Sequence, residues 1–149
     1  MSRKQESFTI LIDHSFAGYP VDVRTCHLKT GDYSLQTETE DFSASGLCIE
    51  RKSKSDLFQS LTHHRERFKK EWSRMNNYEY AAVIIEDSSF LSLLTPPEGN
   101  HTNPKAIVQS LVSWQIRFPR VHVFTIDNRN LSECLIYSLC EKFLYNKRR

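Results

Sequence analysis

The chain has 149 residues, of which 39% are hydrophobic and 11% aromatic, so it is long enough to bury one hydrophobic core. Its longest uninterrupted apolar run, Ala81–Ile85, is far too short to cross a membrane, so we expect no membrane association. The net charge of +2 neither indicates nor excludes a nucleic-acid partner. We expect one domain, spanning residues 1–149.

The N-terminus and the cysteines bear on cellular location. Met1–Ser7 lacks the apolar core that a secretion signal needs. No two cysteines have the C-x-x-C spacing of a zinc knuckle or a thioredoxin-like redox site. We therefore expect an intracellular protein with reduced cysteines. It would lie in the cytoplasm or nucleoid if the source is a bacterium or phage, and in the nucleus if it is a eukaryote.

The N-terminal part of the chain predicts strands separated by turns. Phe8–Asp13 is apolar and ends in a carboxylate, and Val21–Leu28 alternates apolar and polar residues; both patterns predict strands. Lys29–Asp32 contains a glycine and predicts a turn, after which Tyr33–Leu35 resumes an extended segment. Thr37–Gly46 is polar, and we expect an exposed loop there.

A strand that leads into a long helix comes next. Leu47–Lys52 predicts the strand, and Ser55–Asn76 predicts the helix. Apolar residues recur along one stripe of this helix, at Leu57, Leu61, Phe68, Trp72 and Met75. The other faces of the helix are mainly basic.

The C-terminal half alternates strands and helices. Tyr80–Glu86 is a continuous apolar strand, followed by a loop over Asp87–Asn103. Pro104–Arg117 predicts a helix capped by Asn103, with proline at its first position. Val121–Ile126 predicts a further strand.

A capping-box pattern, Asn130 followed by Glu133, predicts the start of a last helix. This helix carries Leu135, Leu139 and Phe143. Together with Leu111 and Trp114 of the preceding helix, these residues would form core or a dimer face. The order of elements predicts a single mixed α/β domain, with a sheet between layers of helices.

Charged residues gather at the predicted strand ends. Because side chains alternate along a strand, Glu50 and Lys52 project to one face and Arg51 to the other. Further carboxylates come from separate segments: Asp13 at the end of the first strand, Asp32 in the glycine turn and Asp56 in the first helical turn.

Phosphodiester hydrolysis uses such a set of groups. Carboxylate oxygens hold Mg²⁺ or Mn²⁺, which polarises the phosphoryl oxygen and lowers the pKa of the attacking water. A nearby lysine offsets the charge that builds up on the phosphate. A carboxylate two residues before a lysine, with a remote aspartate, is typical of restriction-endonuclease-like nucleases. Surface strands also alternate Glu and Lys, so the triplet alone is a weak indication.

The pattern extends well beyond this triplet. It comprises Gly31-Asp32, then Glu50-Arg51-Lys52-x-x-x-Asp56-Leu57-x-x-Ser60-Leu61, then Arg65. This run closely resembles the nuclease domain of the XPF family of structure-selective endonucleases, whose core pattern is G-D, a variable gap and E-R-K-x-x-x-D. Three further segments are similar to the family: Ile10–Asp13, Val83–Glu86 and Phe118–Val121. The resemblance covers nearly the whole chain and implies a restriction-endonuclease-like fold, a mixed central sheet flanked by helices.

The resemblance also implies roles for individual residues. The implied catalytic set comprises Asp13, Asp32, Glu50, Arg51, Lys52 and Asp56. Asp32 and Glu50 would bind Mg²⁺ or Mn²⁺, with Asp13 as a supporting ligand, and Lys52 would be the catalytic lysine. Arg51 is expected to fix the backbone of the site or to pair with a carboxylate.

Several of these residues have ordinary structural uses as well. Asp56 would complement the positive end of its helix in any case, and Asp13 could cap a loop. Glu86 and Asp87 are candidates for an outer shell of the site, although strand-end carboxylates are more often solvated. The histidines His14, His63 and His64 are candidate bases, but the family pattern needs none.

The long helix presents basic side chains, at Arg65, Arg67, Lys69, Lys70 and Arg74, that Glu66 and Glu71 only partly balance. Because the helix begins at the expected active site, we expect DNA phosphate contacts from Arg65, Arg67 and Lys69, and from Lys54 at its start. The ordinary alternative is a solvated helix face, and Arg65 would then brace the site.

The chain departs from the family in two respects. Many members carry a tandem helix-hairpin-helix domain for DNA binding and dimerisation, whereas this chain ends at Arg149, directly after its last predicted helix. The polar loop between Tyr33 and Leu47 also looks longer than in short members. A homodimer, or a partner that supplies helix-hairpin-helix DNA binding, is therefore expected.

These observations lead to one function and two alternatives. We expect a Mg²⁺- or Mn²⁺-dependent endonuclease that cuts branched, flapped or forked DNA, at junctions of single strand and duplex, during repair or recombination. The first alternative is a non-catalytic DNA-binding or scaffold subunit that pairs with another protein. Inactive family members usually lose the catalytic acids or lysine, which this chain keeps. The second alternative is a nuclease that acts on RNA.

Overall fold

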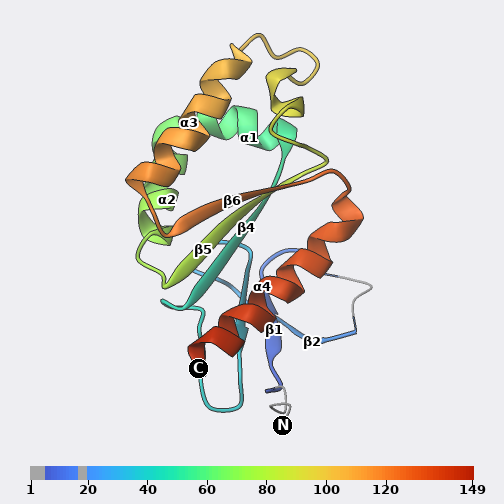
Figure 1. Cartoon of the computed structure of the whole chain (residues 1–149), viewed down its shortest axis with the longest axis vertical. Coiled ribbons are helices and arrows are strands. Elements are labelled where there is room, and N and C mark those ends of the chain that lie inside the picture. The colour runs from blue at the N-terminus through green and yellow to red at the C-terminus, as the bar shows by residue number, and fades with distance from the viewer. Residues whose placement is uncertain (1–5, 17–19) are drawn as a thin grey trace.

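The fold is a mixed β-sheet between two layers of helices (Figure 1). The computed structural model describes residues 6–16 and 20–149, so most of Met1–Ser7, on which the secretion argument rests, lies outside it. Within this range the strands are β1 (Thr9–Ile12), β2 (Asp22–Thr25), β3 (Tyr33–Gln36), β4 (Leu47–Ser53), β5 (Tyr80–Glu86) and β6 (Val121–Ile126). Their order in the sheet is β2-β1-β3-β4-β5-β6.

Strand directions divide the sheet into two parts. β3 is antiparallel to both of its neighbours, β1 and β4. β4, β5 and β6 are parallel, and each crossover between them passes through helices. The helices are α1 (Lys54–Leu61), α2 (Arg65–Met75), α3 (Pro104–Arg117) and α4 (Ser132–Lys147). The predicted α/β class, a mixed sheet flanked by helices, is confirmed.

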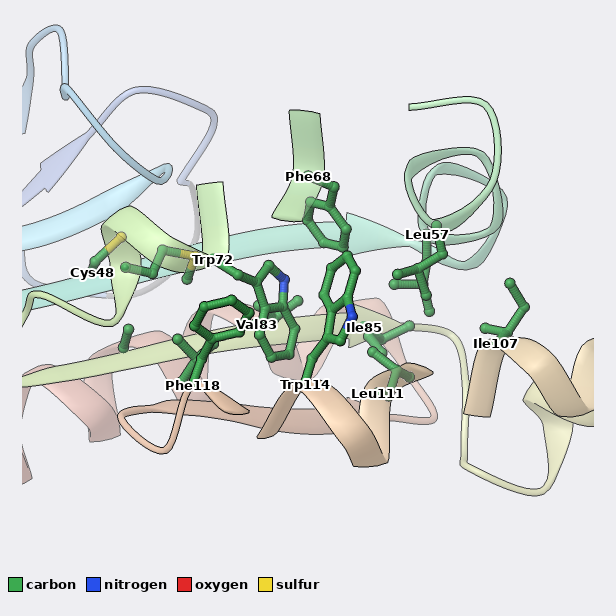
Figure 2. Packing of buried hydrophobic residues seen from close by; sticks show 14 of the residues in the cluster. Cys48, Leu57, Phe68, Trp72, Val83, Ile85, Ile107, Leu111, Trp114 and Phe118 are labelled. Atoms are coloured by element: carbon green, nitrogen blue, oxygen red, sulfur yellow. The ribbon is translucent and has the colours of Figure 1, made fainter. Parts of the chain in front are cut away.

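Each face of the sheet has its own hydrophobic core. On one face, residues of α1, α2 and α3 pack with Cys48, Val83 and Ile85 (Figure 2). Trp72 of α2 is fully buried there, and its ring lies 5.3 Å from that of Trp114 in an edge-on arrangement. On the other face, α4 packs against β3, β4 and β5, and Ile10 and Ile12 of β1 belong to the same core. Both faces of β4 are therefore covered, and its side chains alternate between two different environments.

The predicted helix over Ser55–Asn76 is wrong in its middle, because the chain turns between α1 and α2. The Thr62 side chain donates to the carbonyl of Phe58, at 2.7 Å, in place of a regular continuation. The backbone N–H groups of Thr62 and His64 both donate to the carbonyl of Gln59. The apolar stripe continues across this turn, so periodicity alone did not reveal it.

The predicted start of the last helix is also wrong. A short 3₁₀ turn, Arg129–Leu131, precedes α4, and Asn128 caps that turn by accepting from the N–H of Asn130. α4 then begins at Ser132 without a side-chain cap. Its buried face consists of Ser132, Ile136, Cys140 and Leu144, whereas the predicted Leu135, Leu139 and Phe143 pack at the margin of this core.

Three other predicted element bounds are confirmed. β5 and β6 have the predicted bounds, and α3 begins at Pro104, where the Asn103 side chain accepts from the N–H of Lys105 at 3.0 Å.

Two predictions in the N-terminal half differ from the structure. The second strand is shorter than predicted, with all four of its residues exposed. In the loop expected to be exposed, Phe42 is buried against α4. Within the described residues, no helix is long and apolar enough to span a membrane.

The turn before β3 requires glycine. Gly31 has φ +77°, a backbone conformation that residues other than glycine rarely adopt. A Cβ at this position would lie 2.5 Å from Cys48 Sγ and 3.0 Å from the carbonyl oxygen of Ile49. Gly31 thus lets the turn approach β4 closely and sets the position of Asp32.

Gly31→Ala should destabilise the protein by roughly 2–4 kcal/mol, since it combines backbone strain with overpacking against β4. Gly99→Ala is the matched control: Gly99 has φ +78°, but nothing lies within 4 Å of a Cβ there. It should cost only the strain, roughly 1–2 kcal/mol. Urea unfolding measures both. Equal losses would show that the approach to β4 is not tight.

Candidate active site

Asp32 is held at the start of β3 by its neighbours on both sides. Its N–H donates to the carbonyl of Ile49, and its own carbonyl accepts from the N–H of Asp13, each at 2.8 Å. Its carboxylate oxygen Oδ2 accepts from the backbone N–H of Arg51, also at 2.8 Å. These bonds join the glycine turn to the middle of β4, so the two halves of the sequence motif meet.

Glu50 and Lys52 lie on the face of β4 that is covered by α1, α2 and α3. Lys52 Nζ is 3.7 Å from Glu50 Oε1 and 4.9 Å from the centre of the Phe68 ring. The Glu50 side chain is only 12% exposed and the Lys52 side chain 17%, so the pair is shielded from most bulk water. The prediction that these two residues share a face is confirmed.

A third acidic residue, Glu71 of α2, lies near these groups. Its carboxyl group raises the pKa of Glu50 and, through its charge, that of Asp32. Sequence reasoning treated Glu71 only as a partial balance for the basic helix face. A signal was present: Glu71 lies one turn after Phe68 and directly before Trp72, at the edge of the buried stripe.

Burial and neighbouring acids raise the pKa of Glu50 and of Asp32. The pKa of Glu50 rises to about 9, chiefly because the group is buried and further because Glu71 and Asp32 are near, while Lys52 opposes the rise. Burial also raises the pKa of Asp32, although the N–H of Arg51 partly counteracts the rise. Crowded, poorly hydrated carboxyl groups either keep a proton or bind a cation.

Arg51 lies on the opposite face of β4, as alternation predicted, in a polar network under α4. Its guanidinium pairs with the carboxylate of Glu86, which also accepts from Ser132 Oγ at 2.7 Å. The same guanidinium donates to the Tyr33 hydroxyl at 3.0 Å, and Tyr33 donates to the carbonyl of Ser15 at 2.7 Å. The network joins β3, β4, β5 and α4 behind the acidic site.

The remaining predicted acids have separate surroundings. Asp13 Oδ2 accepts from the N–H of Leu28 at 2.9 Å and lies 3.3 Å from His27 Nδ1, so this carboxylate caps a loop. Asp56 is exposed in the first turn of α1, where Ser53 provides the cap. Asp87 binds Arg129 rather than the site. Catalytic roles for Asp13 and Asp56 stay predictions.

Two of the predicted DNA-binding residues make internal contacts. Lys54 Nζ donates to the carbonyl of Ser92 at 2.8 Å. Arg65 donates to Ser110 Oγ at 2.9 Å and lies 5.0 Å from the centre of the Trp114 ring, which braces α2 against α3. Arg67 is exposed and Lys69 half-buried. DNA contacts by all four residues stay predictions.

Two of the three candidate histidines lie apart from the acids, and one lies close to them. His63 and His64 are exposed in the turn between α1 and α2. His14 is near Asp32, whose pKa its charge lowers, and its Nδ1 is 3.3 Å from the Tyr33 hydroxyl. A role as a base stays open for each.

The donor set fits a hard divalent cation. Among residues 6–16 and 20–149, no three acidic, histidine or cysteine side chains converge into a ready-made metal cage. Mg²⁺ does not require one, since it is usually held by one or two carboxylates together with retained waters and substrate phosphates. Asp32 and Glu50 supply two such carboxylates, and the crowding around Glu50 favours a positive charge there.

Comparisons with known proteins agree with the motif. The family model of the ERCC4 domain matches residues 3–139. Among solved structures, XPF from Aeropyrum pernix is similar, with a TM-score of 0.65 and 20% sequence identity. The match covers 90% of this chain and 63% of that one, and at this identity it shows a shared fold. A search of curated proteins finds no significant match.

Glu50→Gln should stabilise the metal-free protein at alkaline pH. Folding raises the pKa of Glu50 from 4.5 to about 9, so ionisation opposes folding increasingly as pH rises through this window. At pH 8 the gain should be roughly 3–5 kcal/mol, and it should vanish near pH 4. Urea unfolding with EDTA at several pH values measures it. The exposed Glu98→Gln is the control, and a pH-independent difference would contradict the assigned cause.

Proposed function

Because the chain belongs to the ERCC4-domain family of nucleases, we propose that it is a DNA endonuclease that requires Mg²⁺ or Mn²⁺. The observation that carries this proposal is the meeting of Asp32 and Glu50, from separate segments, beside the ammonium group of Lys52. Two carboxylates and a lysine at the end of a strand suit hydrolysis of a phosphodiester.

Each residue would contribute a distinct action. Asp32 and Glu50 would hold the cation, which supplies polarisation of the phosphate and a lowered pKa of the attacking water. Lys52, restrained by Glu50 and the Phe68 ring, would stabilise negative charge on the phosphate. Arg51 would act indirectly: its backbone N–H orients Asp32, while its side chain is anchored to Glu86.

The substrate would be DNA with junctions of single strand and duplex, as in flaps and forks processed during repair or recombination. This part of the proposal rests on the family resemblance. The chain spans 63% of the length of the solved XPF chain, so a second copy, or a partner that supplies helix-hairpin-helix DNA binding, would complete substrate recognition.

Cleavage of labelled flap, fork and plain duplex DNA with Mn²⁺ or Mg²⁺ tests the activity. Asp32→Ala, Glu50→Ala and Lys52→Ala should each lower the rate by about a hundredfold or more, because each removes a group that acts at the phosphate. The exposed Glu66→Gln should cleave normally. DNA binding without cleavage of any substrate would instead favour the scaffold function. Cleavage of RNA in preference to DNA would show that the substrate is RNA.

The basic residues of α2 should supply phosphate contacts. Arg67→Ala and Lys69→Ala should each weaken binding to all DNA sequences alike and reduce the slope of log K against log salt by about one. Fluorescence anisotropy across a salt series measures this. Lys142→Ala, on α4 at the other face of the sheet, is the control; an equal effect there would show that the charge of α2 has no special role.

A further inference from the structure

Tyr33 directly follows Asp32 and is the first residue of β3, the strand that lies between β1 and β4. It pairs with Ile12 of β1 on one side and with Ile49 of β4 on the other. Its side chain is fully buried in the core that α4 covers. A tyrosine in such a place needs partners for its hydroxyl group, since an unpaired buried hydroxyl is costly.

The hydroxyl group of Tyr33 has a partner in each neighbouring segment. It donates to the carbonyl oxygen of Ser15 at 2.7 Å and accepts from the guanidinium of Arg51 at 3.0 Å. These directions are fixed, because a carbonyl only accepts and a guanidinium only donates. His14 Nδ1 lies 3.3 Å from the same oxygen. One buried oxygen thus connects β3 with β4 and with the loop that follows β1.

The loop after β1 also packs against the Tyr33 ring. The centres of the His14 and Phe16 rings lie 6.1 Å and 6.3 Å from the centre of this ring. The same loop begins at Asp13, whose N–H donates to the carbonyl of Asp32 at 2.8 Å. Contacts with Tyr33 therefore help to fix the loop beside the predicted acids.

Asp32 and Tyr33 both bind Arg51, through different parts of that residue. The Asp32 carboxylate accepts from the backbone N–H of Arg51, and the Tyr33 hydroxyl accepts from its guanidinium. The two bonds close a ring with the backbone and side chains between them, so β3 and β4 cannot shift past each other without breaking one. The guanidinium also pairs with Glu86, which anchors the ring to β5. Bonds that lock a supporting residue in this way set the geometry of a site.

We propose that Tyr33 is a positioning residue of the site: its hydroxyl group holds Arg51 where the backbone N–H of Arg51 orients Asp32, and it holds the loop that begins at Asp13. The catalytic consequence rests on the proposed nuclease function, whereas the positioning can be tested without any substrate. Tyr33 would act only through these neighbours, since its side chain lies in the core under α4.

Amide hydrogen exchange in Tyr33→Phe tests the positioning directly. The variant keeps the ring and removes only the hydroxyl group, so the core packing is retained. The Arg51 N–H should exchange at least about tenfold faster than in the wild type, because its bond to Asp32 opens more often. The N–H of Leu111, in the buried part of α3, reports unfolding of the whole domain and should be accelerated less.

Ser34→Ala is the matched control. Ser34 is the next residue of β3, and its buried hydroxyl donates to the carbonyl of Leu47 at 2.7 Å. The variant therefore also loses one buried hydroxyl bond between β3 and β4, but at the first residue of β4 rather than at Arg51. Relative to Leu111, exchange at Arg51 should stay within about twofold of the wild type.

Cleavage kinetics test the catalytic consequence. Tyr33→Phe should lower kcat by roughly tenfold and leave KM within about twofold, since Asp32 is less well oriented while no DNA contact is lost. Ser34→Ala should cleave at the wild-type rate. A loss of overall stability alone would not produce this separation of kcat from KM in only one of the two variants.

The outcomes separate this inference from the proposed function. Where the wild type cleaves DNA, the inference requires both effects in Tyr33→Phe and neither in Ser34→Ala. If either effect is missing, or both variants behave alike, the inference is overturned and the nuclease function stands. If the wild type cleaves no substrate, the proposed function fails, and exchange at Arg51 alone decides whether Tyr33 positions Asp32.

Discussion

The site depends on one hydrogen bond, from the backbone N–H of Arg51 to the carboxylate of Asp32. It joins two parts of the motif that are far apart in the sequence and sets the acid of the turn beside the strand that carries Glu50. The bond requires a close approach of the turn to β4, and a Cβ at Gly31 would clash with Cys48 and Ile49 in that position. A backbone donor also gives Asp32 an orientation that does not depend on a flexible side chain.

β4 separates chemistry from support by the alternation of its side chains. Glu50 and Lys52 face the helices of one layer, where acids crowd together and oppose ionisation. Arg51 faces α4, where its guanidinium donates to Glu86 and to the Tyr33 hydroxyl, and Ser132 donates to the same carboxylate of Glu86. Buried pairs of this kind add little net stability, but losing one partner is costly, so the network fixes the strand rather than strengthening the fold. The crowded acids on one face of β4 are thus held in place by the hydrogen-bonded network of Arg51 on the other face.

Much of this arrangement could be predicted because local rules decide it. Strand alternation separated Glu50 and Lys52 from Arg51, and turn chemistry identified Gly31. The break at Thr62 was missed, since the apolar stripe of α1 continues into α2 and a side-chain bond to the backbone leaves no periodic signal. Glu71 was missed for a related reason: on a basic helix a single glutamate looks like charge balance, and only the packing of Phe68 and Trp72 against β4 shows which way it points.

The position of α2 places two kinds of charge on one helix. One edge of this helix meets the acids of β4, and its exposed face carries Arg67 with other basic residues. A cation that binds the acidic edge would relieve repulsion and hold the helix, and a DNA phosphate that binds the basic face would favour the same position. Two ligands that prefer one position of a shared element strengthen each other's binding. The proposed binding of metal and the proposed binding of DNA would therefore be coupled through α2.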